Sequence, residues 1–289
     1  MAEERGSYQA ELATAAAAVT AAGAVVREYY DAANAKTYGK IDGSPVTDAD
    51  LAADATIRDV IAQHFPHDPI LTEEGMDDER RLASARCWIA DPIDGTEQFI
   101  MRTGEFDVLV AFVLDGRPVA AAGFQPAANV LVTASKGGGA WVRCGAGAAQ
   151  RVTLEPPGER LRLATSKWFG APENAELVQT VADALGAGLE PPTVTGFSPR
   201  IFLPPRTLDV MLGVRPGEAQ DMASEWDFAV ADLVFHEAGG VVTDLAGRRF
   251  RYNKPEPRNV GGLIATIDAR AHARVIEAVS RLPAVASTL

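Results

Sequence analysis

The chain has 289 residues, 47% hydrophobic and 23% charged, enough for one large domain or two closely packed subdomains. Its net charge of −12 argues against a nonspecific binder of nucleic acid or of an anionic membrane. Neither the two cysteines, Cys87 and Cys144, nor the four histidines have the spacing of a zinc site. These features fit a cytoplasmic protein with no nucleic-acid polymer and no membrane among its partners.

The first predicted element is an alanine-rich amphipathic helix over residues 8–35. Its most apolar run, residues 12–26, is too short and too weakly hydrophobic to span a bilayer. The run also lacks the basic start of a signal peptide. We therefore expect an ordinary amphipathic helix of the fold.

A second helix is expected after the turn at residues 42–45. Thr47 or Asp48 can cap it, and it should end near His64. Asp50 falls in its first turn, where the helix dipole favours a carboxylate. The position of Asp50 is explained equally well by helix capping and by a catalytic role.

Two short apolar strands are predicted next, and acids follow each of them. Residues 69–72 precede a glutamate pair that begins at Glu73, and residues 87–90 precede residues 91–96, DPIDGT. If the two strands are neighbours, Glu73 and Asp91 emerge at the same edge of one sheet.

The DPIDGT turn combines two carboxylates three residues apart, Asp91 and Asp94, with Gly95 and the hydroxyl of Thr96. Carboxylate oxygens suit Mg²⁺, and a glycine lets a ligand approach the backbone closely. Taken alone, such a turn is more often an ordinary Asx-type turn than a metal site.

The rest of the first half predicts an antiparallel sheet over residues 85–143, with strands at 105–114, 118–124 and 130–134. The glycine run at 137–139 is expected to be a hairpin turn, because no Gly-Lys-Ser/Thr closes it as in a P-loop. The first two helices can pack on this sheet.

The small, proline-containing stretch at 145–160 is the best subdomain boundary. It divides an N-terminal α+β subdomain, residues 1–150, from a C-terminal α/β subdomain, residues 151–289. Residues 191–205 are expected to form a loop. The other predicted elements of the second half are strands at 161–165, 207–214, 241–244 and 263–266 and helices at 171–185 and 269–281.

A further helix is predicted over residues 224–238, with Ser224 as N-cap and the pair Gly239-Gly240 as its stop. Asp227 then lies in the first turn. It can complement the helix dipole, or it can project from the helix start into a metal site.

Four acids therefore sit beside the ends of elements, namely Glu73, Asp91, Asp94 and Asp227. If they form one cluster, each like-charge pair at about 4 Å costs on the order of 4 kcal/mol, so the cluster requires bound cations. Two or three Mg²⁺ ions held by carboxylates are a common apparatus for hydrolysing phosphomonoesters. Thr96 would supply a hydroxyl beside the ions, and Asp50 could accept its proton.

The chain resembles the inositol monophosphatase superfamily. The resemblance rests on five segments in the same order: residues 46–50 (VTDAD), 73–74 (EE), 91–96 (DPIDGT), 226–227 (WD) and 237–240 (EAGG). It covers nearly the whole chain. It implies an α/β (α+β) fold, a layered α/β/α/β/α sandwich of the inositol monophosphatase and fructose-1,6-bisphosphatase type.

The resemblance also implies roles for individual residues. The Mg²⁺ ligands would be Glu73, Asp91, Asp94, Asp227 and the backbone carbonyl of Ile93. Thr96 and Asp50 would activate the attacking water, with Glu73 also counted in the catalytic set. Inhibition by Li⁺ and a homodimer are further expectations from the family.

Within the superfamily, residues 94–106 (DGTEQFIMRTGEF) are similar to those of bacterial 3′(2′),5′-bisphosphate nucleotidases, which act on adenosine 3′,5′-bisphosphate. The motif that begins at Lys40 (KIDGSPVT) and residues 252–254 (YNK) point the same way. The substrate half departs from that subfamily at residues 166–169, 196–200 and 204–207. An inositol, sugar or histidinol phosphate, in specialised metabolism, is therefore the alternative substrate. The substrate-binding residues would be Gly95, Thr96, Gly196, Arg200, Arg206, Asp227 and Lys254.

The three basic residues of that set, Arg200, Arg206 and Lys254, are equally explained as solvated surface charges. A rival of a different class is a catalytically idle protein that binds a phosphorylated metabolite. The pair Thr96 and Asp50 argues against it, because a pure sensor needs no water activator.

Overall fold

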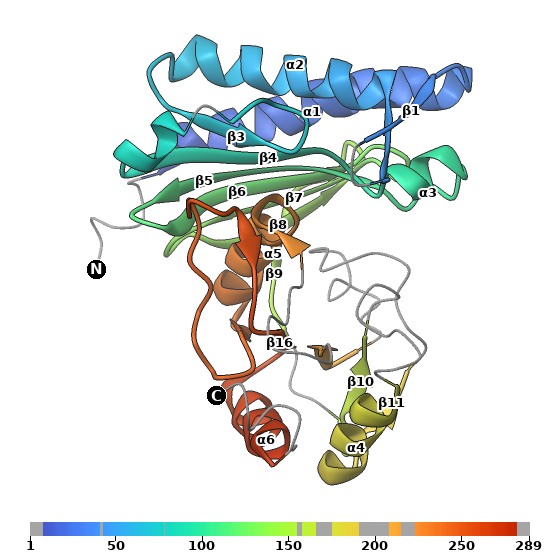
Figure 1. Cartoon of the computed structure of the whole chain (residues 1–289), viewed down its shortest axis with the longest axis vertical. Coiled ribbons are helices and arrows are strands. Elements are labelled where there is room, and N and C mark those ends of the chain that lie inside the picture. Colours follow the sequence, from blue (N-terminus) through green and yellow to red (C-terminus); the bar gives the residue numbers. More distant parts are fainter. Residues whose placement is uncertain are drawn as a thin grey trace.

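Three layers of helix alternate with two β-sheets, as Figure 1 shows from the helices at its top to those at its bottom. This α/β/α/β/α sandwich confirms the predicted fold class. The structure is a computed structural model that describes residues 8–40, 43–77, 79–154, 158–165, 175–190, 208–214 and 223–281.

The first layer consists of α1 (Gln9–Ala32) and α2 (Asp48–His64), close to their predicted bounds. Thr47 is the N-cap of α2, which settles the choice between the two predicted caps. A hairpin of β1 (Thr37–Gly39) and β2 (Pro45–Thr47) connects the helices.

Helix α1 is long and apolar enough to cross a membrane by length and composition, with a mean hydropathy of 1.3. The expectation from the sequence concerned residues 12–26 alone, which are only part of this helix. Residues one helical turn apart, including Ala15, Val19, Ala22 and Val26, are fully buried in the cluster shared with α2 and the sheet. This packing accounts for the apolar stripe of α1 as part of a core.

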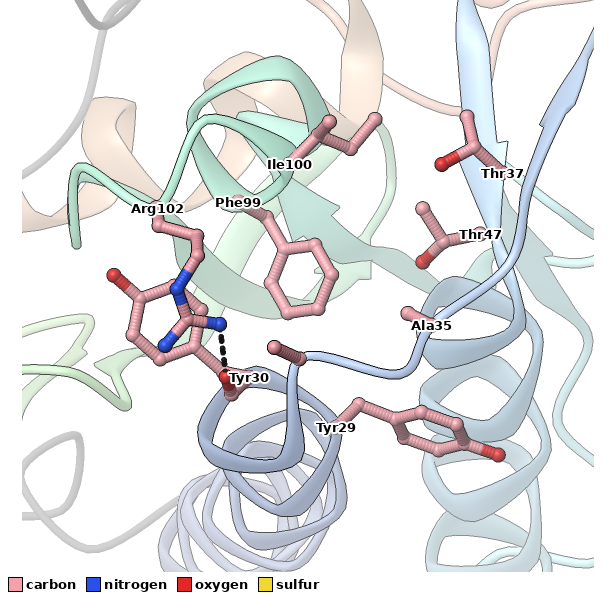
Figure 2. A pocket seen from close by; sticks show the side chains of 9 residues that line it. Tyr29, Tyr30, Ala35, Thr37, Thr47, Phe99, Ile100 and Arg102 are labelled. Atoms are coloured by element: carbon pink, nitrogen blue, oxygen red, sulfur yellow. Dashed lines mark hydrogen bonds between the residues drawn. The ribbon is translucent and has the colours of Figure 1, made fainter.

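A cavity of about 110 Å³ lies at the end of this layer, between the C-terminus of α1, the hairpin and α3 (Thr96–Ile100). In Figure 2, Phe99 and Ile100 from α3 face Thr37 and Thr47 from the hairpin across it. Among the residues that the structure describes, no carboxylate lines this cavity, so it is distinct from the acid cluster described below.

The large sheet has seven strands in chain order. They are β3 (Ile70–Thr72), β4 (Arg86–Asp94), β5 (Asp107–Leu114), β6 (Arg117–Gln125), β7 (Val130–Ser135), β8 (Gly139–Cys144) and β9 (Gln150–Val152). Strand β3 runs parallel to β4, with Ile70 opposite Trp88, and the later neighbours are antiparallel. The predicted neighbours, the antiparallel sheet and the glycine hairpin turn are confirmed.

Strand β4 is longer than predicted, because it continues through the DPID motif rather than ending before it. Asp91 lies opposite Leu109, whereas Asp94 lies opposite Asp107, so β4 carries one residue more than β5 between these pairs. Residues three apart on a regular strand point to opposite faces, and one inserted residue reverses that relation. The bulge thus places both aspartates on the same side of the sheet.

Both faces of the large sheet are buried. Trp88 and Val110 belong to the cluster with α1 and α2, while their neighbours Ile89 and Ala111 belong to the cluster with α5 (Glu225–Ala238). A strand buried on both faces has a continuous apolar sequence, which is why β5 shows no alternation.

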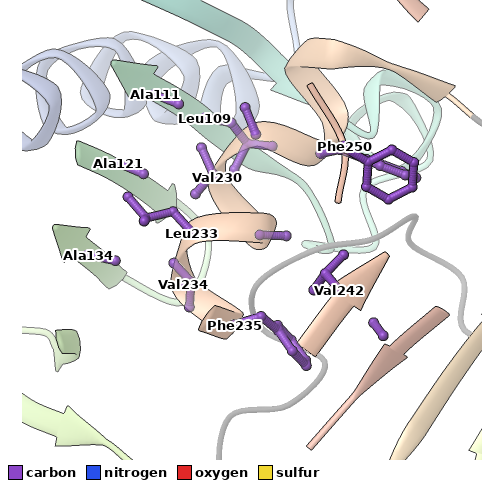
Figure 3. Close-up of a cluster of buried hydrophobic side chains, with 14 of the residues drawn as sticks. Leu109, Ala111, Ala121, Ala134, Val230, Leu233, Val234, Phe235, Val242 and Phe250 are labelled. Atoms are coloured by element: carbon purple, nitrogen blue, oxygen red, sulfur yellow. The ribbon is translucent and has the colours of Figure 1, made fainter. Parts of the chain in front are cut away.

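Helix α5 fills the space between the two sheets. Figure 3 shows Val230, Leu233 and Val234 on α5 between Ala121 of the large sheet and Val242 of the smaller one. The predicted cap and stop are confirmed, because Ser224 is the N-cap and Gly239 follows the helix with φ +100°.

The smaller sheet has the strand order β11-β10-β12-β16-β14. Its strands are β10 (Arg162–Ala164), β11 (Gly188–Leu189), β12 (Val210–Gly213), β14 (Val241–Thr243) and β16 (Leu263–Thr266). Met211 faces α5, whereas Val210 and Leu212 face the last layer, α4 (Ala175–Leu185) and α6 (Ala269–Ser280). The described parts of the second half agree with prediction; the loop at 191–205 lies outside the described residues.

Candidate active site

Three carboxylates from two different elements converge where the large sheet meets α5. Asp91 and Asp94 come from the bulged end of β4, and Asp227 comes from the first turn of α5. One oxygen of each lies within 4.8 Å of the others. Carboxylate oxygens at this spacing are a donor set that suits a hard divalent cation such as Mg²⁺. The structure therefore brings together three of the four acids that the sequence singled out as ligands.

Asp91 is the most buried member of this cluster, with 1% of its surface exposed. Burial raises its pKa well above the ordinary value, and the charges of Glu73, Asp94 and Asp227 raise it further. One oxygen of Asp91 also accepts the backbone N–H of Ile93 at 3.0 Å. A bound cation would relieve the repulsion among these carboxylates.

Asp227 lies both in the capping box of α5 and in the acid cluster. One of its oxygens, Oδ2, accepts the backbone N–H of Ser224 at 2.7 Å and closes the capping box of α5. Burial and, next, the charge of Glu73 raise the pKa of Asp227 to about 7. A single carboxylate thus caps the helix and faces the cluster.

Glu73, the fourth acid, directly follows β3 and acts electrostatically on both Asp91 and Asp227. Its carboxylate accepts a hydrogen bond from the ammonium of Lys40 at 2.6 Å, and that ammonium also lies 2.6 Å from the carboxylate of Glu74. The sequence used Lys40 only as part of a motif and missed this contact. A lysine beside an Asp-Gly turn carries no local signal of a partner 33 residues away.

Beside the cluster, Thr96 and Asp50 form the predicted pair. The Thr96 hydroxyl donates to Asp50 Oδ1 at 3.0 Å, against 3.3 Å to the carbonyl of Ile93. Asp50 Oδ2 accepts the backbone N–H and the hydroxyl of Thr47, at 2.8 and 2.6 Å. Asp50 therefore closes the capping box of α2 and at the same time accepts a hydrogen bond from Thr96, as Asp227 closes the capping box of α5.

Gly95 makes the turn from β4 into α3. It has φ +98°, and a Cβ there would lie 3.1 Å from the carbonyl of Glu105 and 3.2 Å from Gln98 Oε1. The position therefore favours glycine both for its backbone conformation and for space. Its N–H and that of Thr96 begin the short helix that carries the Thr96 hydroxyl.

Gly95→Ala is expected to lower the free energy of unfolding by about 1–2 kcal/mol and turnover roughly 100-fold, because a forced shift would misplace Thr96. Gly137→Ala is the matched control, since Gly137 has φ +74° but open space around a Cβ. It should show a similar loss of stability with full turnover in a phosphate-release assay. Equal turnover of the two variants would contradict the expectation.

The other predicted substrate residues have different outcomes. Gly196, Arg200 and Arg206 lie outside the described residues. Lys254 makes an ion pair with Glu225 at 2.6 Å and donates to the carbonyl of Arg251 at 2.7 Å. Its ammonium is thus held at the start of α5.

The comparisons with known proteins agree with this geometry. The profile of the inositol monophosphatase family matches residues 8–187. The 3′(2′),5′-bisphosphate nucleotidase CysQ of Escherichia coli O157:H7 is 31% identical over 243 residues, covering 81% of this chain and 91% of that protein. Nus factor SuhB of Salmonella typhimurium is 32% identical over 243 residues, covering 82% and 85%.

Among solved structures, CysQ from Bacteroides thetaiotaomicron matches with a TM-score of 0.74 at 25% identity, covering 90% of this chain and 98% of that one. A layered sandwich with this similarity to known phosphatases defines the chain as a phosphatase. It belongs to the inositol monophosphatase family.

Proposed function

We propose that the protein is a Mg²⁺-dependent phosphomonoesterase, with Glu73, Asp91, Asp94, Asp227 and the carbonyl of Ile93 as metal ligands. The observation that carries the proposal is the convergence of Asp91, Asp94 and Asp227 oxygens within 4.8 Å. The raised pKa values of Asp91 and Asp227 support it, because burial of like charges is relieved by a cation. When bound, Mg²⁺ would polarise the phosphate and neutralise charge on the leaving oxygen.

In this proposal Thr96 and Asp50 handle the proton of the attacking water. The Thr96 hydroxyl donates to the carboxylate of Asp50 in preference to the more distant carbonyl of Ile93, so its lone pairs remain to accept from water. Asp50 is fixed by its two bonds to Thr47 and orients Thr96 in turn.

For the substrate, we infer a small phosphorylated metabolite, with adenosine 3′,5′-bisphosphate as first choice. Residues 99–106 (FIMRTGEF) and the 31% identity to a 3′(2′),5′-bisphosphate nucleotidase support it. Gly95, Thr96 and Asp227 would line the phosphate side. The remainder of the substrate would be bound by Gly196, Arg200, Arg206 and Lys254.

An inositol, sugar or histidinol phosphate is the second candidate. The altered segments at 166–169 and 196–200 favour it, as does the match to the inositol monophosphatase family. The similarity to a solved inositol monophosphatase at 22% identity bears on the fold alone, so the choice between substrates depends on assay.

Phosphate release from adenosine 3′,5′-bisphosphate, inositol 1-phosphate, fructose 1,6-bisphosphate and histidinol phosphate, with and without Mg²⁺, tests the proposal. We expect Mg²⁺-dependent turnover, highest on the nucleotide. Turnover of none of them would overturn the enzyme assignment to these substrates. Thermal stabilisation by a ligand without turnover would favour the metabolite-binding protein.

We further infer inhibition by Li⁺, a cytoplasmic location and a homodimer, with no nucleic-acid polymer as partner. Li⁺ inhibition should appear as a loss of Mg²⁺-dependent turnover that excess Mg²⁺ reduces, because both cations would use the same carboxylates. Sedimentation at micromolar concentration tests the homodimer, and a DNA and RNA binding assay tests the last inference.

A further inference from the structure

The candidate metal site is assembled from two separate parts of the fold. Asp91 and Asp94 belong to the large sheet, whereas Asp227 belongs to α5, which reaches the site from the second half of the chain. The distance between the two parts must be fixed for the three oxygens to share one cation. The segment 251–259 contacts both parts; in Figure 1 it lies in the orange-red chain beside α5.

This segment holds the start of α5 through Glu225, which is fully buried. Glu225 Oε2 accepts the backbone N–H of Asn253 at 2.6 Å, and Oε1 accepts the backbone N–H of Lys254 at 3.1 Å. The Lys254 ammonium neutralises the same carboxylate at 2.6 Å. Glu225 lies two residues before Asp227, so the segment is tied to the turn that carries the candidate ligand.

The same segment holds the connection between β3 and β4 through Arg81, which is 1% exposed and belongs to the short helix η2 (Arg80–Ala83). Arg81 Nη1 donates to Asn253 Oδ1 at 3.0 Å and to the carbonyl of Lys254 at 2.7 Å. In return, Asn253 Nδ2 donates to the carbonyls of Arg81 and Ser84, at 2.9 and 3.3 Å. This connection lies between Glu73 and Asp91 in the chain.

The two sets of contacts meet at Asn253 and Lys254, and of these two only Asn253 contacts the sheet side through its side chain. Its backbone N–H binds the α5 side, and its side-chain amide binds the sheet side with both a donor and an acceptor. Its φ of +60° points the backbone and the amide in these two directions, and asparagine is among the few residues that adopt this conformation readily.

We propose that Asn253 is a positioning residue that sets the spacing between Asp227 and the aspartates of β4. This inference rests on the proposed function, since it concerns the same carboxylates. Without the amide, the segment loses the Asn253 bonds to Arg81 and Ser84 and keeps only the bonds of Arg81 to the carbonyls of Lys254 and Pro255. A cation that needs ligands from both parts then binds more weakly, because part of its binding free energy is used to hold the two parts together.

The test compares Asn253→Gly with wild type in Mn²⁺ binding, measured by calorimetry at 20 °C on the full chain. Glycine keeps the positive φ and changes no charge, so a loss of affinity reports the missing amide. We expect at least tenfold weaker binding. Asn129→Gly is the matched control, since Asn129 has φ +52°, is exposed, and lies in the turn between β6 and β7; its affinity should stay within twofold of wild type.

Equal Mn²⁺ affinity of Asn253→Gly and wild type, both folded, would overturn the inference. Mn²⁺ binding by Asp94→Asn distinguishes a failure of the positioning role of Asn253 from a failure of the proposed function. If wild type binds no Mn²⁺, or Asp94→Asn binds as tightly as wild type, the metal site itself is wrong. If only Asp94→Asn weakens binding, the site stands and the positioning role of Asn253 is wrong.

If Asn253→Gly does not fold, Asn253→Asp replaces it. Aspartate keeps the acceptor for Arg81 and tolerates the positive φ, but it lacks the donor to the carbonyls of Arg81 and Ser84. Its added negative charge favours cations, so weaker Mn²⁺ binding would support lost positioning. Unchanged or tighter binding would overturn the inference.

Discussion

Asp94→Asn is expected to reduce phosphate release about 1,000-fold while leaving the fold intact. A carboxylate ligand supports several kcal/mol of transition-state stabilisation by its metal, and each 1.4 kcal/mol corresponds to roughly tenfold in rate. The amide has nearly the same shape as the carboxylate, and the structure brings Asp94 within 4.8 Å of two other carboxylates. Removing one charge therefore relieves repulsion in the metal-free protein, and thermal stability without metal should rise rather than fall.

The measurement is phosphate release at saturating Mg²⁺ beside a thermal melt of the metal-free protein. Asp115→Asn is the matched control, because Asp115 lies in the exposed turn at the other end of β5, with φ +51° that asparagine also adopts. It should retain wild-type turnover. An Asp94→Asn variant within threefold of wild type would remove Asp94 from the mechanism.

The sequence was informative wherever local chemistry determines structure. The cap at Ser224, the stop at Gly239 and the choice of Thr47 or Asp48 as cap of α2 follow from short patterns. The pairing of β3 with β4 was only a condition in the sequence prediction, and the structure fulfils it. For Asp50, the structure confirms helix capping, and its hydrogen bond with Thr96 is compatible with the catalytic role, which stays a prediction. The third position of a capping box points one carboxylate oxygen back at the helix end and leaves the other for a neighbour.

Contacts between segments far apart in the chain could not be predicted from the sequence. The bulge in β4 depends on its register with β5, and no residue of DPIDGT encodes that register by itself. The Lys40–Glu73 pair and the Arg81–Asn253 link join residues 33 and 172 positions apart. Such pairs follow from topology, which fixes which loops meet, rather than from propensity.

Adding Mg²⁺ to the metal-free protein is expected to raise Tm by about 5–10 °C at pH 8 and by much less at pH 5.5. A ligand at 100 times its Kd raises the free energy of unfolding by about 2.7 kcal/mol. Each 1 kcal/mol shifts Tm by about 2–4 °C for a chain of this size class. The pH dependence follows from Asp227, whose pKa is raised by burial and by Glu73 from 3.8 to about 7. A protonated carboxyl cannot ligate, so protons compete with the cation below this value.

The stability of the metal-free protein changes with pH in the opposite direction to the stabilisation by Mg²⁺. Because the folded Asp227 binds a proton that the unfolded chain has released between pH 4 and 7, this group makes metal-free stability fall as pH rises through that window. The stabilisation by Mg²⁺ therefore grows over the same window in which the intrinsic stability declines. Asp227→Asn should flatten both trends in Tm measured from pH 5.5 to 8. A Mg²⁺ effect of equal size at both pH values would show that the cation binds elsewhere, away from buried carboxylates.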